Sequence, residues 1–296
     1  MKKSKQAAAA KETGRKSRGQ GAEIWHRLRK NKFAMGALVF IMLLVLAVAF
    51  AEYLTPYDYQ AVDLAHALEF PSLEHPMGTD QYGRDLLTRL LYGGRISLLI
   101  ALITVAGSVL VAGVIGISAG YFGGWLDNVL MRCMDVLMAI PGMLMAIAIA
   151  SALGGGIVNT AIAIGIGHIG GLARIFRSSV LLLREQEYIE AAEAFGSGNL
   201  RIIRKHILPN TLAPIIVQCT LKIGESILSI ASLSFIGLGI APPTPEWGSI
   251  LNSGRDLIMS FWPIITFPGI FIALTMLAFN LLGDGLRDAM DPRLKQ

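Results

Sequence analysis

The chain has 296 residues, a net charge of +5 and a mean hydropathy of +0.56; 53% of its residues are hydrophobic and 16% are charged. This composition excludes an ordinary soluble domain and predicts a protein built from membrane-spanning helices. The positive charge does not indicate nucleic-acid binding, because eleven of the 26 Lys and Arg residues precede Phe33. A basic flank before an apolar segment is typical of the cytoplasmic side of a membrane protein.

The chain begins with a polar, repetitive stretch, and we expect residues 1–32 to form a disordered basic tail in the cytoplasm. The first predicted membrane span, Phe33–Ala51, contains no charged residue. About 20 apolar residues are needed to cross a hydrocarbon core of about 30 Å. Its last residues also match an A-x-A signal-peptidase site, but the apolar stretch exceeds the usual length of about 7–15 residues. We therefore expect an uncleaved anchor.

An acidic segment follows the first span and is expected to lie outside the cytoplasm, so that residues 33–92 form one span and one extracytoplasmic loop. The end of this segment predicts a glycine-punctuated turn and a short amphipathic helix, whose apolar face carries Leu86, Leu87, Leu90 and Leu91. His75, Asp80 and Asp85 match no specific spacing of metal ligands, and no metal site is predicted.

Five further apolar stretches complete a set of six predicted spans: Ile96–Gly120, Asp135–Leu153, Ile157–Ala173, a stretch from Pro209 to Leu233, and Pro263–Gly283. Within the third span, Pro141 is expected to kink the helix, which is tolerated where neighbours satisfy the freed carbonyl. The two cysteines, Cys133 and Cys219, lie far apart in apolar segments. Their positions indicate that both are packing residues and that they form neither a disulfide nor a metal site.

The Lys and Arg residues outside the spans predict the orientation of the chain. Eleven lie in the N-terminal tail, one in residues 121–132, six in residues 174–212 and three in the C-terminal tail. The first outside loop contains three and the last contains one. Because cytoplasmic loops are enriched in these residues, both termini are predicted to be cytoplasmic. The expected fold class is an all-α integral membrane protein with six transmembrane helices.

The longest polar interruption, Tyr188–Asn210, predicts two short helices joined by a glycine break. Alanine and glutamate favour a helix in the first half, Gly196 and Gly198 end it, and Asn199 caps a basic amphipathic second half. An interfacial helix on lipid headgroups would explain only the basic half. The sequence Glu190-Ala191-Ala192 instead predicts a low-profile surface that docks in a groove of another protein.

Three ionisable residues in the predicted spans are candidates to line a pathway: His168, Lys222 and Glu225. A charge at the bilayer centre costs about 2.5–3.5 kcal/mol. Lys222 and Glu225 are three residues apart, so we expect them to share a helical face, to pair, and to line the interior of the bundle. His168 is a relay, a ligand contact or a hydrogen-bonded packing residue near the helix end, and the packing role is favoured.

The spacing of Glu190-Ala191-Ala192, Gly196 and Leu208-Pro209 resembles the EAA loop of ABC-importer permeases. His206 stands where that family commonly has a hydrophobic residue, in a sequence that resembles its peptide-transporter branch. The stretches that carry this second resemblance are HILPN (206–210), HPMGTDQYGRDLLTRLLYGGRISL (75–98), GLGIAPPTPEWGSIL (237–251) and FNLLGDGLRDAMDPRL (279–294). The chain is similar to the C-type permease subunit of dipeptide, oligopeptide or nickel ABC importers.

The resemblance implies the type I ABC importer transmembrane fold, with a core over residues 93–284, a coupling loop over 188–210 and a cytoplasmic tail over 285–296. In that family the loop inserts into a cleft of a cytoplasmic ATPase. The resemblance therefore assigns ATPase coupling to Glu190, Ala191, Ala192, Gly196, Arg204, His206, Leu208, Pro209 and Asn210.

The resemblance also implies partners and a location. The partners are a second permease in a heterodimer, two cytoplasmic ATPase subunits, an extracytoplasmic solute-binding protein and membrane lipid. The location is the inner (plasma) membrane of a bacterium or archaeon.

No Gly-Lys dipeptide occurs in the chain, so it contains no P-loop. We expect a chain that is not an enzyme and binds no cofactor, with ATP and Mg used by partner ATPases. Peptides are preferred to nickel as the solute. Two alternatives come from other classes: a scaffold that recruits a cytoplasmic protein, and a secondary carrier. The carrier would need an intramembrane ion site, for which the candidates are Asp135, His168, Lys222 and Glu225.

Overall fold

The computed structural model describes residues 20–290, and the segments 1–19 and 291–296 lie outside the described residues. Within the described range the structure is helical and contains no strand, as predicted. The helices are α2 (Gln20–Leu28), α3 (Lys32–Ala49), α4 (Ala51–Leu54), α5 (Leu86–Phe122), α6 (Gly124–Ala139), α7 (Gly142–Leu153), α8 (Ile157–Arg184), α9 (Glu187–Ala194), α10 (Asn199–Ile202), α11 (Leu208–Phe235), α12 (Trp247–Ser253) and α13 (Pro263–Met290). Short turns η1 (Leu64–His66), η2 (Ile203–Ile207) and η3 (Arg255–Leu257) accompany them.

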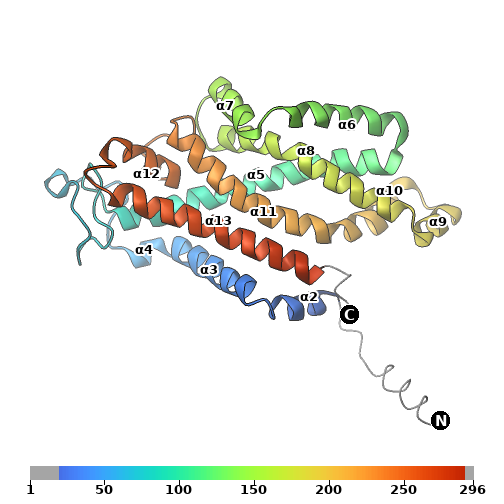
Figure 1. The fold of residues 1–296 in the computed structure, drawn as a ribbon, viewed down its shortest axis with the longest axis horizontal. Helices are drawn as coiled ribbons and strands as arrows, with labels where there is room; N and C mark the ends of the chain where they lie inside the picture. Colours follow the sequence, from blue (N-terminus) through green and yellow to red (C-terminus); the bar gives the residue numbers. More distant parts are fainter. Residues whose placement is uncertain (1–19, 291–296) are drawn as a thin grey trace, which may run out of the picture.

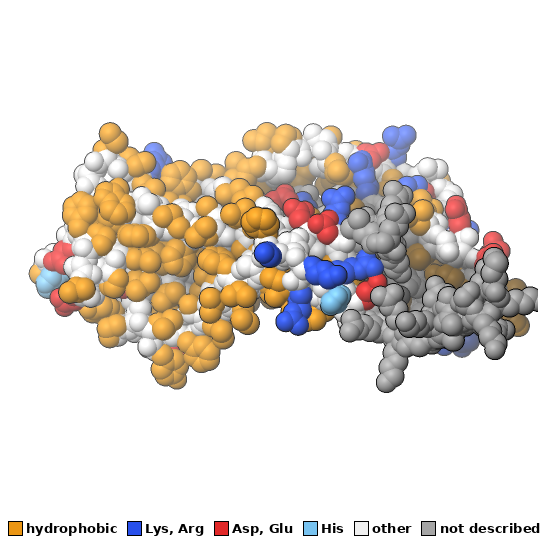
Figure 2. Space-filling model, turned by 60° about the horizontal axis from the view of Figure 1, so that its bottom comes forward, with side chains coloured by type: hydrophobic (Ala, Val, Ile, Leu, Met, Phe, Trp, Pro, Cys, Tyr) orange, Lys and Arg blue, Asp and Glu red, His pale blue; other side chains and the backbone are white. Residues whose placement is uncertain are grey.

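The long helices form an elongated bundle with a different set of short elements at each end (Figure 1). One end carries α12 and the loop between α4 and α5, and the other carries α9 and α10. Figure 2 shows hydrophobic side chains spread over a broad face of the bundle, with charged side chains gathered towards the end that carries α9. This surface is that of a membrane protein, because lipid-facing helices present apolar side chains outward.

Five helices are long and apolar enough to cross a membrane, and the bent pair α6 and α7 raises the number to six if it counts as one span. The six-span prediction is thereby confirmed in outline, but the prediction of a kink at Pro141 is wrong. The two helices meet at 87°. Ile140 has extended backbone angles, as expected before proline, and the proline ring prevents the helix from continuing. Helix α6 also occupies most of the predicted loop 121–132.

Three further boundaries differ from the sequence predictions. The predicted short amphipathic helix and the second span form one 37-residue helix, α5, whose first turn is capped by Asp85 accepting a hydrogen bond from Thr88 N. Helix α8 continues past Ala173 to Arg184. Residues 20–28 belong to helix α2, although they were predicted to lie in a disordered tail. In each case no proline interrupts the segment, so backbone hydrogen bonding continues through it.

Close packing of α5 on α8 depends on small residues in α5. A Cβ atom at Gly116 would lie 2.3 Å from the carbonyl oxygen of Ala173 and 2.6 Å from Cβ of Phe176. At Gly120 it would lie 2.8 Å from Cβ of Val180. Glycines spaced in this way let two membrane helices approach through their backbones.

Replacing Gly116 by valine is therefore expected to separate α5 from α8 and to destabilise the fold by about 1–3 kcal/mol or more. Thermal unfolding of the detergent-purified protein would measure the loss. The matched control is Gly107→Val on the same helix, because a Cβ atom at Gly107 has no neighbour within 4 Å. Equal unfolding temperatures for the two variants would contradict this account of the packing.

Helix α6 is held along α8 by ion pairs. The guanidinium of Arg177 donates to both carboxylate oxygens of Asp127, over 2.5 Å and 2.6 Å. Arg174 donates to Asp135 over 2.6 Å. Asp135, one of the four ionisable candidates for a carrier site, is thus already paired with an arginine.

The loop between α4 and α5 is closed by a polar network that uses the three residues considered for a metal site. The carboxylate of Asp80 accepts hydrogen bonds from Arg84 and Arg89. Nδ1 of His75 lies 2.9 Å from Oδ1 of Asp85. These side chains are buried, and their carboxylates bind arginine, histidine and the start of α5. They hold the loop on the bundle.

Candidate functional site

The predicted coupling loop, residues 188–210, forms two short helices at one end of the bundle (Figure 1). Helix α9 covers the acidic half and α10 begins the basic half, as predicted, but the N-cap of α10 is Gly198, and the predicted cap, Asn199, is the first residue of the helix. Between them Gly196 has φ +78°, a left-handed conformation that glycine adopts without strain. After α10 the chain passes through the π-helical turn η2 into α11, with Pro209 in the first turn of α11.

Three isoleucines attach this loop to the bundle. Ile189 on α9 is 1% exposed, and Ile202 and Ile207 are fully buried. They pack in one core cluster with Phe176 and Val180 of α8. The hydroxyl of Tyr121, at the end of α5, donates a hydrogen bond to Asn199 over 3.2 Å. Apolar burial and a hydrogen bond thus attach both halves of the loop to the ends of the long helices.

The outward face of α9 differs from the predicted docking face. Glu190 and Ala191 are exposed, but Ala192 is half-buried and packs against the core cluster. Phe195, which the sequence analysis did not single out, is 90% exposed. Tyr188, Ala191 and Phe195 stand at positions i, i+3 and i+7, which share one helical face. That spacing could have identified Phe195 from the sequence.

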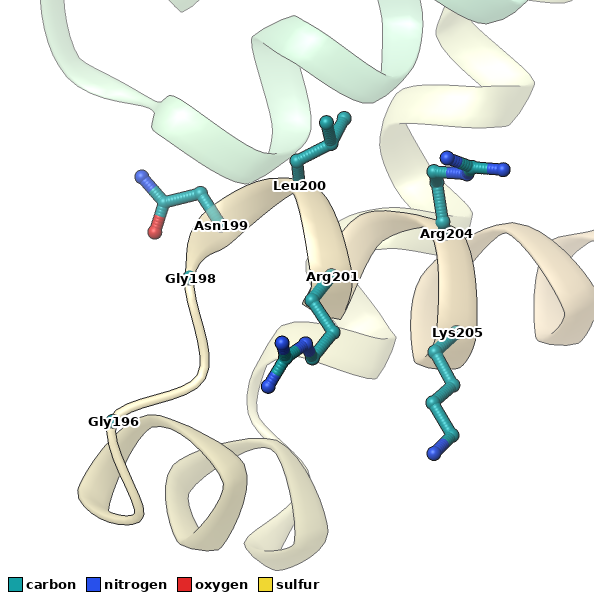
Figure 3. Close-up of a pocket in the computed structure, with 7 residues that line it drawn as sticks. All are labelled: Gly196, Gly198, Asn199, Leu200, Arg201, Arg204 and Lys205. Atoms are coloured by element: carbon teal, nitrogen blue, oxygen red, sulfur yellow. The ribbon is translucent and has the colours of Figure 1, made fainter.

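A groove of about 800 Å³ lies beside the glycine break, and the seven residues that line it are shown in Figure 3. Arg201 and Lys205 extend to the same side of the ribbon, whereas Arg204 extends away from them. All three are exposed, and within residues 20–290 none of them makes an ion pair. Only Arg204 was predicted as a coupling residue. The groove is therefore basic, and its other two cations come from the polar face of the predicted amphipathic helix.

The last residues of the coupling loop form its link to α11. The ring of His206 packs against the ring of Tyr188, with centroids 6.1 Å apart. The side chain of Asn210 donates to the carbonyl of His206 over 2.6 Å. Leu208 and Pro209 are exposed. His206 thus connects α9 to the start of α11.

The three candidates for a pathway come together in the structure although they lie on two helices. Nζ of Lys222 lies 2.5 Å from Oε2 of Glu225, which confirms the predicted pair. Nε2 of His168, on α8, lies 3.7 Å from Oε1 of Glu225. His168 is buried, and its Nδ1 has no hydrogen-bond partner among the described residues. The expected hydrogen-bonded packing role is therefore not what the structure shows.

The charged face of α11 lies at the surface of this chain rather than inside its bundle, contrary to the prediction. The side chain of Glu225 is 52% exposed. Gly224, Ser226 and Ile227, its neighbours, take the buried positions. Of the two cysteines predicted to pack, Cys219 is half-buried but Cys133 is exposed.

The sequence matches two family models. Residues 112–296 match the binding-protein-dependent transport system inner membrane component, and residues 19–74 match the N-terminal TM domain of oligopeptide transport permease C.

Among curated relatives, the dipeptide transport system permease protein DppC of Alkalihalophilus pseudofirmus is 45% identical over 273 residues, which are 92% of this chain and 90% of the relative. The glutathione transport system permease protein GsiD of Escherichia coli O157:H7 is 45% identical over 274 residues, with the same coverage of 92% and 90%.

Two solved structures share the fold. A crystal structure of an amino acid ABC transporter with histidines has a TM-score of 0.51 and 15% identity, and the match covers 66% of this chain and 91% of that one. The MetNI methionine ABC transporter in inward-facing conformations has a TM-score of 0.51 and 16% identity, covering 69% and 97%. At these identities the likeness shows the type I importer fold alone. The family matches and the 45% identical relatives show that this chain belongs to the binding-protein-dependent permease family. It is a multi-pass membrane subunit of an ABC importer of the dipeptide and glutathione type.

Proposed function

We propose that this chain forms, with a second permease subunit, the membrane pathway for di- or oligopeptides, driven by two cytoplasmic ATPase subunits. A solute-binding protein on the other side of the membrane delivers the peptide. The names of the 45% identical relatives support a peptide rather than a metal ion as the solute. ATP and Mg belong to the ATPase subunits, since this chain contains no P-loop.

The observation that carries the proposal is the exposed face of α9, fixed to the bundle by Ile189. Phe195, at the C-cap of α9, is 90% exposed, and Glu190 and Ala191 are exposed as well, so the described part of the chain leaves both apolar and acidic groups of α9 accessible. Such a surface fits a groove of a cytoplasmic partner. For α9 to meet such a partner, α9 and both chain termini must lie on the cytoplasmic side of the inner membrane. The distribution of Lys and Arg predicts the same side.

Coupling follows from the rigidity of the loop. Its buried isoleucines join α9 and η2 to α8, so a displacement of α9 is passed to the ends of α8 and α11. For ATP to drive the pathway, the loop must bind the two states of the ATPase with different affinities, because equal affinity would shift no equilibrium. In the assembled importer, the face of α11 that carries Lys222 and Glu225 lies against the second permease. Both side chains then contact the water-filled pathway instead of lipid.

The test measures binding of the ATPase subunits by the purified permease complex. Phe195→Ala is expected to weaken that binding about tenfold or more, because burying a phenylalanine contributes about 1.5–3 kcal/mol. The matched control is Phe33→Ala, since Phe33 is 77% exposed at the start of α3. Equal ATPase binding by both variants would overturn the coupling role.

Uptake by the assembled importer in vesicles tests which solute the importer transports. ATP-dependent accumulation of peptides supports the proposal. Accumulation of Ni²⁺ without any peptide would overturn the choice of solute, and peptide uptake that needs a proton gradient rather than ATP would overturn the class of transporter.

A further inference from the structure

An apolar chamber of about 610 Å³ lies between α7, α11, α13 and the segment of α12 and η3. Its wall includes Leu228 and Phe235 of α11 and Ile265 and Met276 of α13, and every lining side chain is apolar except Ser232 and Arg255. The volume falls within the range of about 300–1,000 Å³ that is usual for small-molecule sites. We call this space the α11–α13 chamber.

Arg255 supplies the single charge of the chamber. It lies in η3, is exposed, and forms no ion pair or hydrogen bond with another side chain of residues 20–290. A guanidinium presents a planar fork of donors that matches a carboxylate, and such pairs are among the stronger hydrogen bonds in proteins. The chamber therefore combines an apolar wall with one cation that has no counterion among residues 20–290.

The chamber continues along the charged face of α11. Leu228 lines it and lies three residues after Glu225, so the two side chains are neighbours on the helix. From Glu225 to Phe235 the helix rises about 15 Å. The Lys222–Glu225 ion pair thus stands near one end of the chamber and the guanidinium of Arg255 at the rim of the wall, with apolar surface between them.

We propose that the α11–α13 chamber receives the apolar side chains of a short peptide in transit, with the terminal carboxylate of the peptide on Arg255. This inference rests on the proposed function and narrows its substrate class to peptides with apolar side chains and a free carboxyl terminus. A lipid acyl chain also fits the apolar wall, and the comparison of trileucine with triserine below distinguishes the two occupants, because a bound lipid would not make uptake depend on the side chains of the peptide.

The first arm of the test fills the chamber. Ala273 lines it and is exposed, whereas Leu274, the next residue of α13, is 45% exposed and does not line it. Ala273→Trp and Leu274→Trp therefore form a matched pair. The probes are trileucine and triserine, taken up by the complete importer in vesicles, and each variant is compared with the unmodified importer so that the preference of the binding protein cancels.

Ala273→Trp is expected to lower trileucine uptake about tenfold more than triserine uptake, since the bulk removes the place of at least one leucine side chain. Leu274→Trp is expected to leave their ratio unchanged. A loss shared equally by both peptides would overturn the proposal. So would a loss of the second permease from the purified Ala273→Trp complex, since it would mean that a helix of that subunit occupies the chamber.

The second arm tests the cation with trileucine and its C-terminal amide. Arg255→Gln is expected to lower uptake of the free acid about tenfold relative to the amide, because a hydrogen bond to a charged group is lost. Arg255→Lys is expected to recover part of that ratio. An unchanged ratio would overturn the role of Arg255. If the unmodified importer takes up neither peptide with ATP, the proposed function is wrong, and the chamber proposal is wrong with it. If the unmodified importer takes up the peptides but the variants leave the uptake ratios unchanged, only the chamber proposal is wrong.

Discussion

Replacing Gly196 by proline is expected to abolish ATP-driven uptake by the assembled importer while membrane insertion stays intact. The φ angle of Gly196 is +78°, whereas proline is locked near −65°. The backbone N–H of Gly196 also donates to the carbonyl of Glu193 over 2.8 Å, and proline has no such donor. A proline in an incompatible position costs about 3 kcal/mol or more, which corresponds to about a hundredfold loss of correctly positioned α9.

The control for this effect lies two residues away. Gly198 has φ −68°, and a Cβ atom at either glycine would meet nothing within 4 Å. Gly198→Ala should therefore keep normal uptake, while Gly196→Ala should lose part of it through backbone strain alone. Uptake and ATPase rate are measured in the same vesicles. Normal uptake by Gly196→Pro at normal expression would show that the geometry of the break does not matter for coupling.

Glu246→Leu is expected to lower the free energy of unfolding by about 3 kcal/mol or more, because each buried donor left without an acceptor costs about 1–3 kcal/mol. Glu246 is fully buried at the start of α12. Its carboxylate accepts hydrogen bonds from the backbone N–H groups of Gly248 and Ser249, each over 2.9 Å, and from the hydroxyl of Ser97 on α5 over 3.1 Å. Leucine would leave these donors without an acceptor inside the protein.

The loss of stability should extend beyond α12, because Trp247, the residue after Glu246, anchors α12 on α5. Trp247 is fully buried and donates from its ring nitrogen to the carbonyl of Leu90 over 2.9 Å. Thermal unfolding in detergent, followed by tryptophan fluorescence, measures the effect. Glu246→Gln is the matched control, since it keeps the shape and one acceptor and should lose less. Asp256→Leu, on the exposed turn η3, should leave the unfolding temperature nearly unchanged. Unfolding of Glu246→Leu at the unmodified temperature would contradict the network.

Much of this molecule follows from local properties of the chain. The apolar stretches predict the long helices, and glycine chemistry predicts the break between α9 and α10 at Gly196. Both predictions need only the residues of one segment, because hydropathy and backbone preferences are local properties of the chain. The resemblance to importer permeases follows from motif spacing in the same way.

Other features depend on contacts between distant segments, and the sequence did not contain them in readable form. Pro141 could have kinked or broken its helix, and the sequence does not show that α6 turns by 87° and packs along α8, where Asp127 pairs with Arg177. The burial of Glu246 depends on Ser97, 149 residues away. Hydropathy does not specify which side of a helix meets another helix, so the exposure of Glu225 was missed.

The apolar stretches, the glycines, the positive charges and the motif spacing thus determined by themselves that this chain spans a membrane, that its central loop breaks at Gly196, and which family it belongs to. The tertiary structure alone decided that His168 meets Glu225, that Phe195 points outward and Ala192 inward, and that α7, α11 and α13 line an open cavity beside Arg255. The physical reason is that hydrophobic burial and backbone propensity act within a segment, whereas side-chain pairing and cavities arise only when packed helices bring separate segments together.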